Sequence, residues 1–348
     1  MSAKRVTSQD VARHAGVSRT TVSLVLNNVQ DIQISEETRQ RVVKTARELN
    51  YYPDVSARRL VQGRTQVIGF VERQSPLQKF ADPFMGEVLR GLHKAARQHN
   101  YDVLYAPFSP AQEPKDSFMR LIQERHADGI VLSGPRFDDD EIIRLHEQGV
   151  PIVLQGQLPG ANIPVVDVDN VGGARLATEH LIFLGHQRIG MITNGPMIYT
   201  AAYDRRVGYK LALQEAGLAV DDDLIRQAAF SPESGYQAMQ DLLNKSEPPT
   251  AIFIASDAVA IGAIEAARQA GVNIPHELAI VGFDDIPWSA YLNPPLTTVC
   301  LPAHPLGWSA GYLLIRLLNR EEDEEIEDRV LLDTKLVVRE SCGAGLRP

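Results

Sequence analysis

Polar side chains follow several apolar runs in the second half of the chain. Gln155 ends the run PIVL, Ser256 follows AIFIA and Asp284 follows AIVGF. Continuous runs of this kind are typical of strands buried on both faces, and open α/β sheets bind ligands beyond the carboxyl ends of their strands. Amide, hydroxyl and carboxylate groups at that edge can exchange hydrogen bonds with a small polar ligand. The spacing therefore predicts a site for a small molecule.

Aromatic residues near these strand ends are candidates for stacking on a sugar or base ring. Phe84 comes after the first apolar strand and at the start of a helix, whereas Phe80 and Trp288 are weaker candidates. Phe84 could also be an ordinary core residue, and Trp288 is evenly balanced between the two roles. Asp257 is expected to be a helix N-cap, because SDAVAIGA begins a helix, and Asp285 could have the same role.

The patterns of covalent and metal chemistry are missing from this sequence. There is no Walker loop, no G-x-G-x-x-G after a strand, no G-x-S-x-G and no H-E-x-x-H. Cys300 and Cys342 form neither a disulfide framework nor a zinc pattern. The acidic runs 138–140, 221–223 and 321–325 are most simply solvated loops or helix starts. We therefore expect no catalysis, no metal and no cofactor.

A second group of chemically informative residues lies near the N-terminus. Thr7 is a helix cap with an acid three residues later, Gly16 ends that helix, and Ser18 caps a second helix to about Asn27. The inner face of this second helix is apolar, and its outer face carries Arg19, Thr20, Ser23, Leu24 and Asn27. The pattern predicts a helix-turn-helix, whose second helix enters the DNA major groove. A plain helical hairpin would give a similar pattern.

The distribution of charge supports contact between this segment and a polyanion. Residues 1–64 contain 11 Lys and Arg against 6 Asp and Glu, although the whole chain has a formal net charge of -9. A third helix is expected from Glu36 to Leu49, with Ser35 as its cap. A basic head on an acidic body indicates that only the head meets nucleic acid.

After Arg64, apolar runs alternate with amphipathic helices, such as one predicted over Phe84–His99. About ten strands are expected, which is more than one doubly wound sheet holds comfortably, so two α/β lobes are predicted. We see no apolar stretch long enough to span a membrane and no secretory signal. The composition therefore favours a cytoplasmic protein with reduced cysteines.

The sequence also resembles the lactose-repressor (LacI) family along nearly its whole length. The resemblance rests on DVARHAGVSRTTVSLVLNN, on TRQRVVKTARELNYYPDVSARRLVQGRT and on VGFDDIPWSAYLNPPLTTV. It implies that Arg19 and Thr20 read bases, that Thr21 and Ser23 approach phosphates, and that Leu24 meets a thymine methyl where many members carry a basic residue. The full set of residues expected at the DNA is Thr7, Ser18, Arg19, Thr20, Thr21, Ser23, Leu24, Asn27, Arg58, Arg59 and Leu60.

The same resemblance implies the division of the chain. It gives a helix-turn-helix domain over 1–53, a hinge helix over 54–64 and a periplasmic-binding-protein-like core of two doubly wound parallel sheets over 65–345. In the hinge, Leu60 would wedge into the minor groove while Arg58 and Arg59 meet phosphates. We expect crossings near Asp167–Val168, Thr298–Leu301 and Glu327–Val330. Lobe one would hold about 65–167 and 301–328, and lobe two about 168–300 and 329–345.

The function implied is that of a homodimeric, sequence-specific transcriptional regulator, most simply a repressor, which binds pseudo-palindromic operator DNA under the control of a sugar or sugar derivative. Asp284 would accept hydrogen bonds from the effector, and Arg205 would fork onto it. The effector set is Phe80, Phe84, Gln155, Arg205, Ser256, Asp284 and Trp288. The alternative is a solute-binding or sugar-processing protein on the same two-lobe core.

Overall fold

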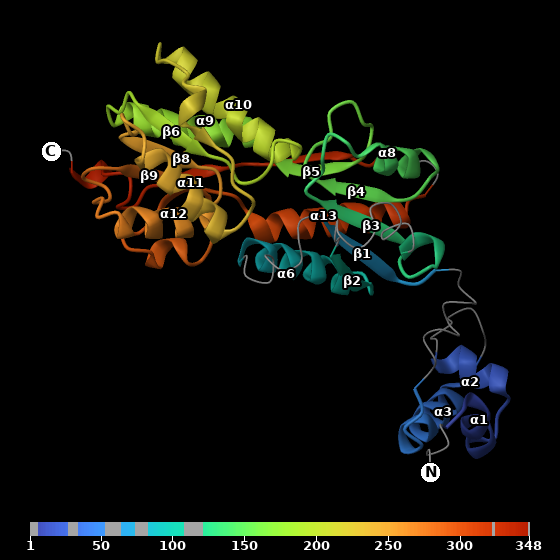
Figure 1. Cartoon of the computed structure of the whole chain (residues 1–348). Helices are drawn as coiled ribbons and strands as arrows, with labels where there is room; N and C mark the ends of the chain where they lie inside the picture. The colour runs from blue at the N-terminus through green and yellow to red at the C-terminus, as the bar shows by residue number, and fades with distance from the viewer. Residues whose placement is uncertain are drawn as a thin grey trace. The chain divides into compact units, whose positions relative to one another are not determined.

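The computed structural model describes residues 6–26, 34–52, 64–73, 83–107, 121–321 and 324–346. The chain forms two compact units, Met1–Gln66 and Val67–Pro348 (Figure 1). Each unit has its own hydrophobic core, so each is described by itself. The predicted hinge helix falls mainly on residues 53–63, which lie outside the described residues.

The first unit is a bundle of three helices, α1 (Ser8–Ala15), α2 (Arg19–Leu26) and α3 (Glu36–Glu48). Thr7 and Asp10 form a reciprocal capping box at the start of α1, and Gly16 ends that helix with φ 65°. The Ser18 hydroxyl accepts a hydrogen bond from the Thr21 backbone N–H at 3.0 Å, at the start of α2. The predicted helix starts are confirmed.

The core of this unit forms because small and β-branched residues recur at helical spacing on the three inner faces. The Arg41 guanidinium also ties α3 to α1, because its Nε donates to the Ala15 carbonyl at 3.0 Å. The buried residues are Val11, Ala12, Ala15, Val22, Val25, Val42 and Ala46. A tightly connected scaffold therefore holds the outer face of α2 in place.

The second unit contains two six-stranded sheets. The first has the order β11-β5-β4-β3-β1-β2, with every pair parallel; the second has the order β12-β10-β9-β8-β6-β7. The strands are β1 (Val67–Glu72), β2 (Asp102–Pro107), β3 (Gly129–Ser133), β4 (Ile152–Gln155), β5 (Val165–Val168), β6 (Ile189–Ile192), β7 (Ile225–Arg226), β8 (Ala251–Ile254), β9 (Ala279–Asp284), β10 (Thr297–Cys300), β11 (Arg329–Leu332) and β12 (Lys335–Val337). The prediction of two parallel sheets is confirmed except that β12 pairs antiparallel with β10.

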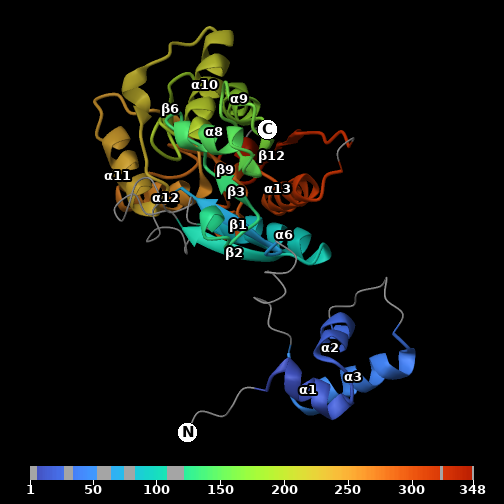
Figure 2. The same cartoon turned by 90° about the vertical axis from the view of Figure 1, so that its right-hand side faces the viewer.

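Helices cover both faces of each sheet (Figures 1 and 2). On the first sheet, α6 (Pro83–Gln98) and α13 (Ala303–Leu318) pack on the face of Val131, whereas α8 (Asp140–Glu147) packs on the face of Ile130 and Leu132. On the second, α9 (Asn170–Phe183) and α10 (Thr200–Glu215) meet Phe253, whereas α11 (Pro232–Leu243) and α12 (Asp257–Gln269) meet Ile252 and Ile254. Successive strand residues point to opposite faces, so these continuous apolar runs fill two layers at once.

The chain passes between the lobes after β5, after β10 and after β11. The third crossing corrects our expectation, because we placed it at Glu327–Val330 and assigned 329–345 to lobe two. Arg329–Leu332 instead pairs with β5 in the first sheet, so the crossing lies at residues 333–334. Val330 and Leu332 are half-buried and pack against the largest hydrophobic cluster of this unit. Across the described ranges, no helix is long and apolar enough to cross a membrane.

Candidate DNA-binding surface and ligand cavity

The outer face of α2 is polar and accessible. Arg19, Thr20 and Ser23 are exposed, while Thr21 and Leu24 are half-buried. The Arg19 Nε donates to the Ser8 hydroxyl at 3.1 Å. This is the arrangement of an exposed recognition helix on a buried apolar seam, with its first turn presenting side chains that can reach base edges.

The two capping residues of the predicted DNA set have a structural role in this unit. The Thr7 hydroxyl donates to the Asp10 carboxylate at 2.7 Å, and the hydroxyls of Ser18 and Thr21 lie 2.9 Å apart. Both caps are exposed beside the helix starts. The remaining predicted contacts, which are Asn27, Arg58, Arg59 and Leu60, lie outside the described residues.

A cavity lies between the lobes at the carboxyl ends of the strands. Five of the predicted effector residues line it, namely Phe84, Gln155, Arg205, Ser256 and Asp284. Trp288 does not line it and has 51% of its surface exposed, because the chain turns away from the cavity after Asp284. Phe80 lies outside the described residues. The rule that ligands bind beyond strand ends therefore located the cavity.

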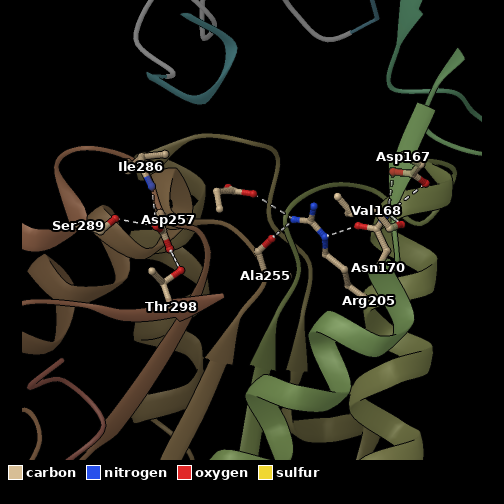
Figure 3. A network of polar contacts seen from close by, with 10 residues as sticks. Asp167, Val168, Asn170, Arg205, Ala255, Asp257, Ile286, Ser289 and Thr298 are labelled. Carbon is tan, nitrogen blue, oxygen red and sulfur yellow. Dashed lines mark hydrogen bonds and ion pairs between the residues drawn. The ribbon is translucent and has the colours of Figure 1, made fainter. Parts of the chain in front are cut away.

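Arg205 is the centre of a buried polar network (Figure 3). It lies one and a half turns into α10 and is only 6% exposed. Its Nε donates to Asn170 Oδ1 at 2.9 Å, its Nη1 donates to the Ala255 carbonyl at 2.6 Å, and Nη1 lies 3.5 Å from Asp284 Oδ1. The guanidinium also lies 3.8 Å from the centroid of the Phe283 ring. Burial lowers the pKa of Arg205, against the opposing effect of Asp284.

The backbone holds Asp284 in an unusual conformation. Its φ is 117°, and that of Asp285 is 55°. Side chains other than glycine rarely adopt such angles, and the strain costs about 1–3 kcal/mol per residue. Asp285 is not the helix cap we considered, because its Oδ1 accepts a hydrogen bond from Arg339 at 2.7 Å. The sharp turn after β9 places the Asp284 carboxyl at the cavity beside Arg205.

Asp167 extends the network to the first crossing between the lobes. It lies in β5, and both of its carboxylate oxygens accept from Asn170 Nδ2, at 3.2 and 3.3 Å. Burial raises the pKa of the Asp167 carboxyl to about 6, although a backbone hydrogen bond from Val168 opposes the shift. The chain from Asp167 through Asn170 to Arg205 therefore joins the first lobe to the second with polar contacts (Figure 3).

Asp257 belongs to a separate cluster, and its role differs from the helix cap that we expected. Ser256, not Asp257, occupies the N-cap of α12, and it makes no side-chain capping bond. The Asp257 carboxylate accepts from the Ile286 N–H at 3.1 Å, from Ser289 at 2.6 Å and from Thr298 at 2.7 Å (Figure 3). Burial raises its pKa to about 7, while these donors act in the opposite direction. Asp257 thus holds the segment after β9 against the start of α12, and it does not line the cavity.

Sequence reasoning missed further residues that line the cavity. They include Ser133, Asp167, Asn170, Asn194, Tyr199 and Phe230. Ser133 and Asn194 follow apolar strands, so the rule that found Gln155 could have found them too. Tyr199 and Phe230 carry no such signal, since their rings meet edge to face, with centroids 5.0 Å apart, only after distant loops converge.

The lobes also touch at one edge of the cavity. The Thr200 N–H donates to the Pro135 carbonyl at 3.2 Å, and the Tyr199 hydroxyl donates to the Arg73 carbonyl at 2.9 Å. Arg73 in turn forms a buried ion pair with Asp139, at 2.6 Å. The start of α10 is therefore attached directly to the first lobe.

Comparison with known proteins agrees with both halves of this description. Residues 7–54 match the model of bacterial regulatory proteins of the lacI family, and residues 178–342 match the periplasmic binding protein-like domain. The HTH-type transcriptional regulator CelR of Thermobifida fusca is 35% identical over 341 residues, covering 97% of this chain and 98% of that protein.

Two solved structures cover the same length. A complex of the transcriptional regulator CelR with cellobiose has a TM-score of 0.74 and 33% identity, covering 97% of this chain and 100% of that one. The lac repressor dimer bound to operator and the anti-inducer ONPF has a TM-score of 0.84 and 28% identity, covering 97% and 99%. With a helix-turn-helix head, a two-lobe core and relatives that match both from end to end, this chain belongs to the LacI family of bacterial regulatory proteins.

Proposed function

We propose that this chain is a cytoplasmic, homodimeric repressor that binds operator DNA through its first unit and a sugar or sugar derivative in the cavity of its second unit. The observation that carries the proposal is the presence in one chain of an exposed polar recognition helix and an interlobe cavity built around Arg205 and Asp284. The full-length match to transcriptional regulators supports binding without catalysis.

For DNA recognition, we assign base contacts to Arg19 and Thr20 and phosphate contacts to Thr21 and Ser23. Leu24 would meet a thymine methyl. The related lac repressor binds its operator as a dimer. Two heads of a symmetric dimer read two half-sites about one helical turn of DNA apart, so the operator would be pseudo-palindromic. Asn27 and the segment with Arg58, Arg59 and Leu60 complete the proposed interface.

For ligand control, we propose that the effector binds one arrangement of the lobes better than the other. A ligand shifts a conformational equilibrium only by its difference in affinity for the two states. Phe84, Gln155 and Ser256 would contact the ligand together with Arg205 and Asp284. The regulator CelR in complex with cellobiose supports a sugar as the ligand class.

The test is a titration of the full chain against labelled DNA that flanks its own gene. It is run with and without a panel of sugars, sugar phosphates and nucleobases. We expect retention that falls steeply with salt and that one compound strengthens or releases. Arg19→Ala should lose DNA binding while it keeps ligand binding. Arg206→Ala removes the same charge from the second unit, so it is the control and should retain DNA like the parent chain.

If no DNA is retained while a sugar still raises the thermal stability of the core, the repressor proposal fails. The solute-binding alternative would then account for the cavity. Turnover of a sugar by the purified chain would contradict the proposal in a different way.

A further inference from the structure

A hydrogen bond joins the first residues of the two helices in the helix-turn-helix. Ser8 begins α1 and Arg19 begins α2, and the Arg19 Nε donates to the Ser8 hydroxyl at 3.1 Å. The reciprocal capping bonds of Thr7 and Asp10 fix the backbone beside Ser8. The Ser8 hydroxyl is therefore an acceptor at a fixed place, and it sets the direction of an arginine side chain that is exposed.

Arg19 has an unfavourable position in its own helix. The peptide dipoles give the N-terminus of a helix a partial positive charge, so a cation in the first turn destabilises the helix. The first turn of α2 contains no acidic residue, and Arg19 forms no ion pair with the residues that the structure describes. Arg13, the other arginine of residues 6–26, lies 3.9 Å from the carboxylate of Asp10. A cation kept at the start of α2 points to an acceptor on a partner molecule.

The bond to Ser8 determines which edge of the guanidinium can meet that partner. The group carries five N–H donors in one plane, and the Nε donor is directed at Ser8. The end with Nη1 and Nη2 then forms a fork of two parallel donors. In the major groove guanine presents two acceptors, O6 and N7, whereas adenine presents one acceptor and one donor. The fork on Arg19 therefore matches guanine better than the other bases.

We propose that Ser8 is a positioning residue for DNA reading, which directs Arg19 so that its Nη1 and Nη2 donate to O6 and N7 of a guanine in each operator half-site. This inference rests on the proposed DNA-binding role of the first unit and specifies one base of the operator. An arginine that is already held in place loses less rotamer freedom on binding than a free one. Ser8 should therefore affect discrimination between bases and not the contacts with phosphates.

The first experiment selects binding sites for the full chain from a library of random duplex DNA. We expect the selected sites to carry an invariant guanine at one position of each half-site. Replacing this guanine with adenine should weaken binding about 5- to 150-fold. Arg19→Lys keeps the charge but not the fork, so it should lose the preference at this position alone. Selected sites without such a guanine, or with a guanine preference that Arg19→Lys leaves unchanged, would overturn the proposal.

The second experiment removes the hydroxyl. Ser8→Ala should lower the ratio of guanine to adenine affinity about 2- to 10-fold, and Ser8→Thr, which restores a hydroxyl, should recover most of it. Alanine is a better helix former than serine, so the variant keeps α1 intact. The dependence of affinity on salt concentration should not change, because it reports phosphate contacts. In an Arg19→Lys background, Ser8→Ala should have no further effect on the ratio.

Gln40→Ala is the matched control, because it also removes an exposed side-chain hydrogen bond from the first unit. Gln40 lies in α3, and its Nε2 donates to Glu36 Oε1 at 3.1 Å. This variant should keep the guanine to adenine ratio of the parent chain. If Ser8→Ala also keeps that ratio while specific binding persists, the positioning role is wrong and the proposed function stands. If the parent chain selects no sequence at all, both proposals fail.

Discussion

Two buried aspartates in the second lobe, Asp257 and Asp284, show how similar groups serve different purposes. Asp257 is fully buried, and three donors, two from the segment after β9 and one from β10, converge on its carboxylate. Asp284 lies at the cavity with a strained φ of 117°, and Arg205 approaches it at 3.5 Å. The first group is saturated by the protein and holds the fold together. The second is held in a strained backbone conformation at the edge of the cavity, where its carboxyl lies beside Arg205.

Removing the saturated carboxylate should have the largest effect. Asp257→Ala leaves the donors of Ile286, Ser289 and Thr298 unsatisfied in the core, so we expect the core to lose about 4 kcal/mol of unfolding free energy. Urea denaturation followed by far-UV circular dichroism measures this loss. Asp241→Ala, whose carboxylate is mostly exposed, is the control and should change stability by less than about 0.5 kcal/mol. Equal losses of stability in Asp257→Ala and Asp241→Ala would show that the three hydrogen bonds to Asp257 do not stabilise the core.

Removing the arginine beside Asp284 should be next in size. Arg205→Met loses hydrogen bonds to Asn170 and Ala255 and leaves Asp284 without its cation, so we expect a loss of about 3 kcal/mol. Ligand control of DNA binding should disappear with it. The same denaturation series, with the neighbouring Arg206→Met as control, checks the stability. A stable Arg205→Met variant that still responds to ligand would show that the network is not part of the site.

The pH dependence of stability should report Asp167. Its folded pKa of about 6 lies above the ordinary value of 3.8, so between about pH 4 and 6 the folded state holds a proton that the unfolded state has released. This carboxyl therefore stabilises the fold least above pH 6, and its contribution falls by about 3 kcal/mol as the pH rises through that window. The Asp167→Asn variant has no carboxyl to titrate at this position. The difference in unfolding free energy between the parent chain and the variant should therefore fall over this pH range. Parallel curves for the two proteins would contradict this.

The smallest expected effect concerns the strained backbone. At position 284, Gly accepts a positive φ without steric cost whereas Ala does not, so Asp284→Gly should be about 1 kcal/mol more stable than Asp284→Ala. Thermal unfolding of the two variants compares them directly, and both should bind sugar weakly. An Ala variant as stable as the Gly variant would mean that the turn relaxes.

Much of this arrangement could be predicted from local sequence. The capping pattern at Thr7 gave the start of α1, and the apolar runs gave most of the strands of the two sheets with the edge where ligands bind. Five of the six predicted effector residues within the described ranges line the cavity. The strand-end rule gave Gln155, Ser256 and Asp284, whereas Arg205 came from the family resemblance. These features depend on periodicity, which is contained in a few neighbouring residues.

The features that could not be predicted depend on distant contacts. β11 stays on the first sheet because of its partner β5, more than 160 positions away in the chain. Asp257 turned from an expected cap into a buried acceptor because Ser289 and Thr298 reach it from later segments. Trp288 lies outside the cavity since two successive residues with positive φ redirect the chain.

The contact between α10 and the first lobe has a mechanical consequence. Thr200, held by Pro135, and Arg205 lie on one rigid helix, about 7.5 Å apart along its axis. The same helix is pressed against α9 at Gly208, where an added Cβ would come within 2.1 Å of the Val171 carbonyl. A displacement of Arg205 is therefore transmitted along a continuous helix and not through a loop. The helix works as a short lever: its N-terminal end is hydrogen-bonded to the first lobe, and its fulcrum is the contact with the start of α9.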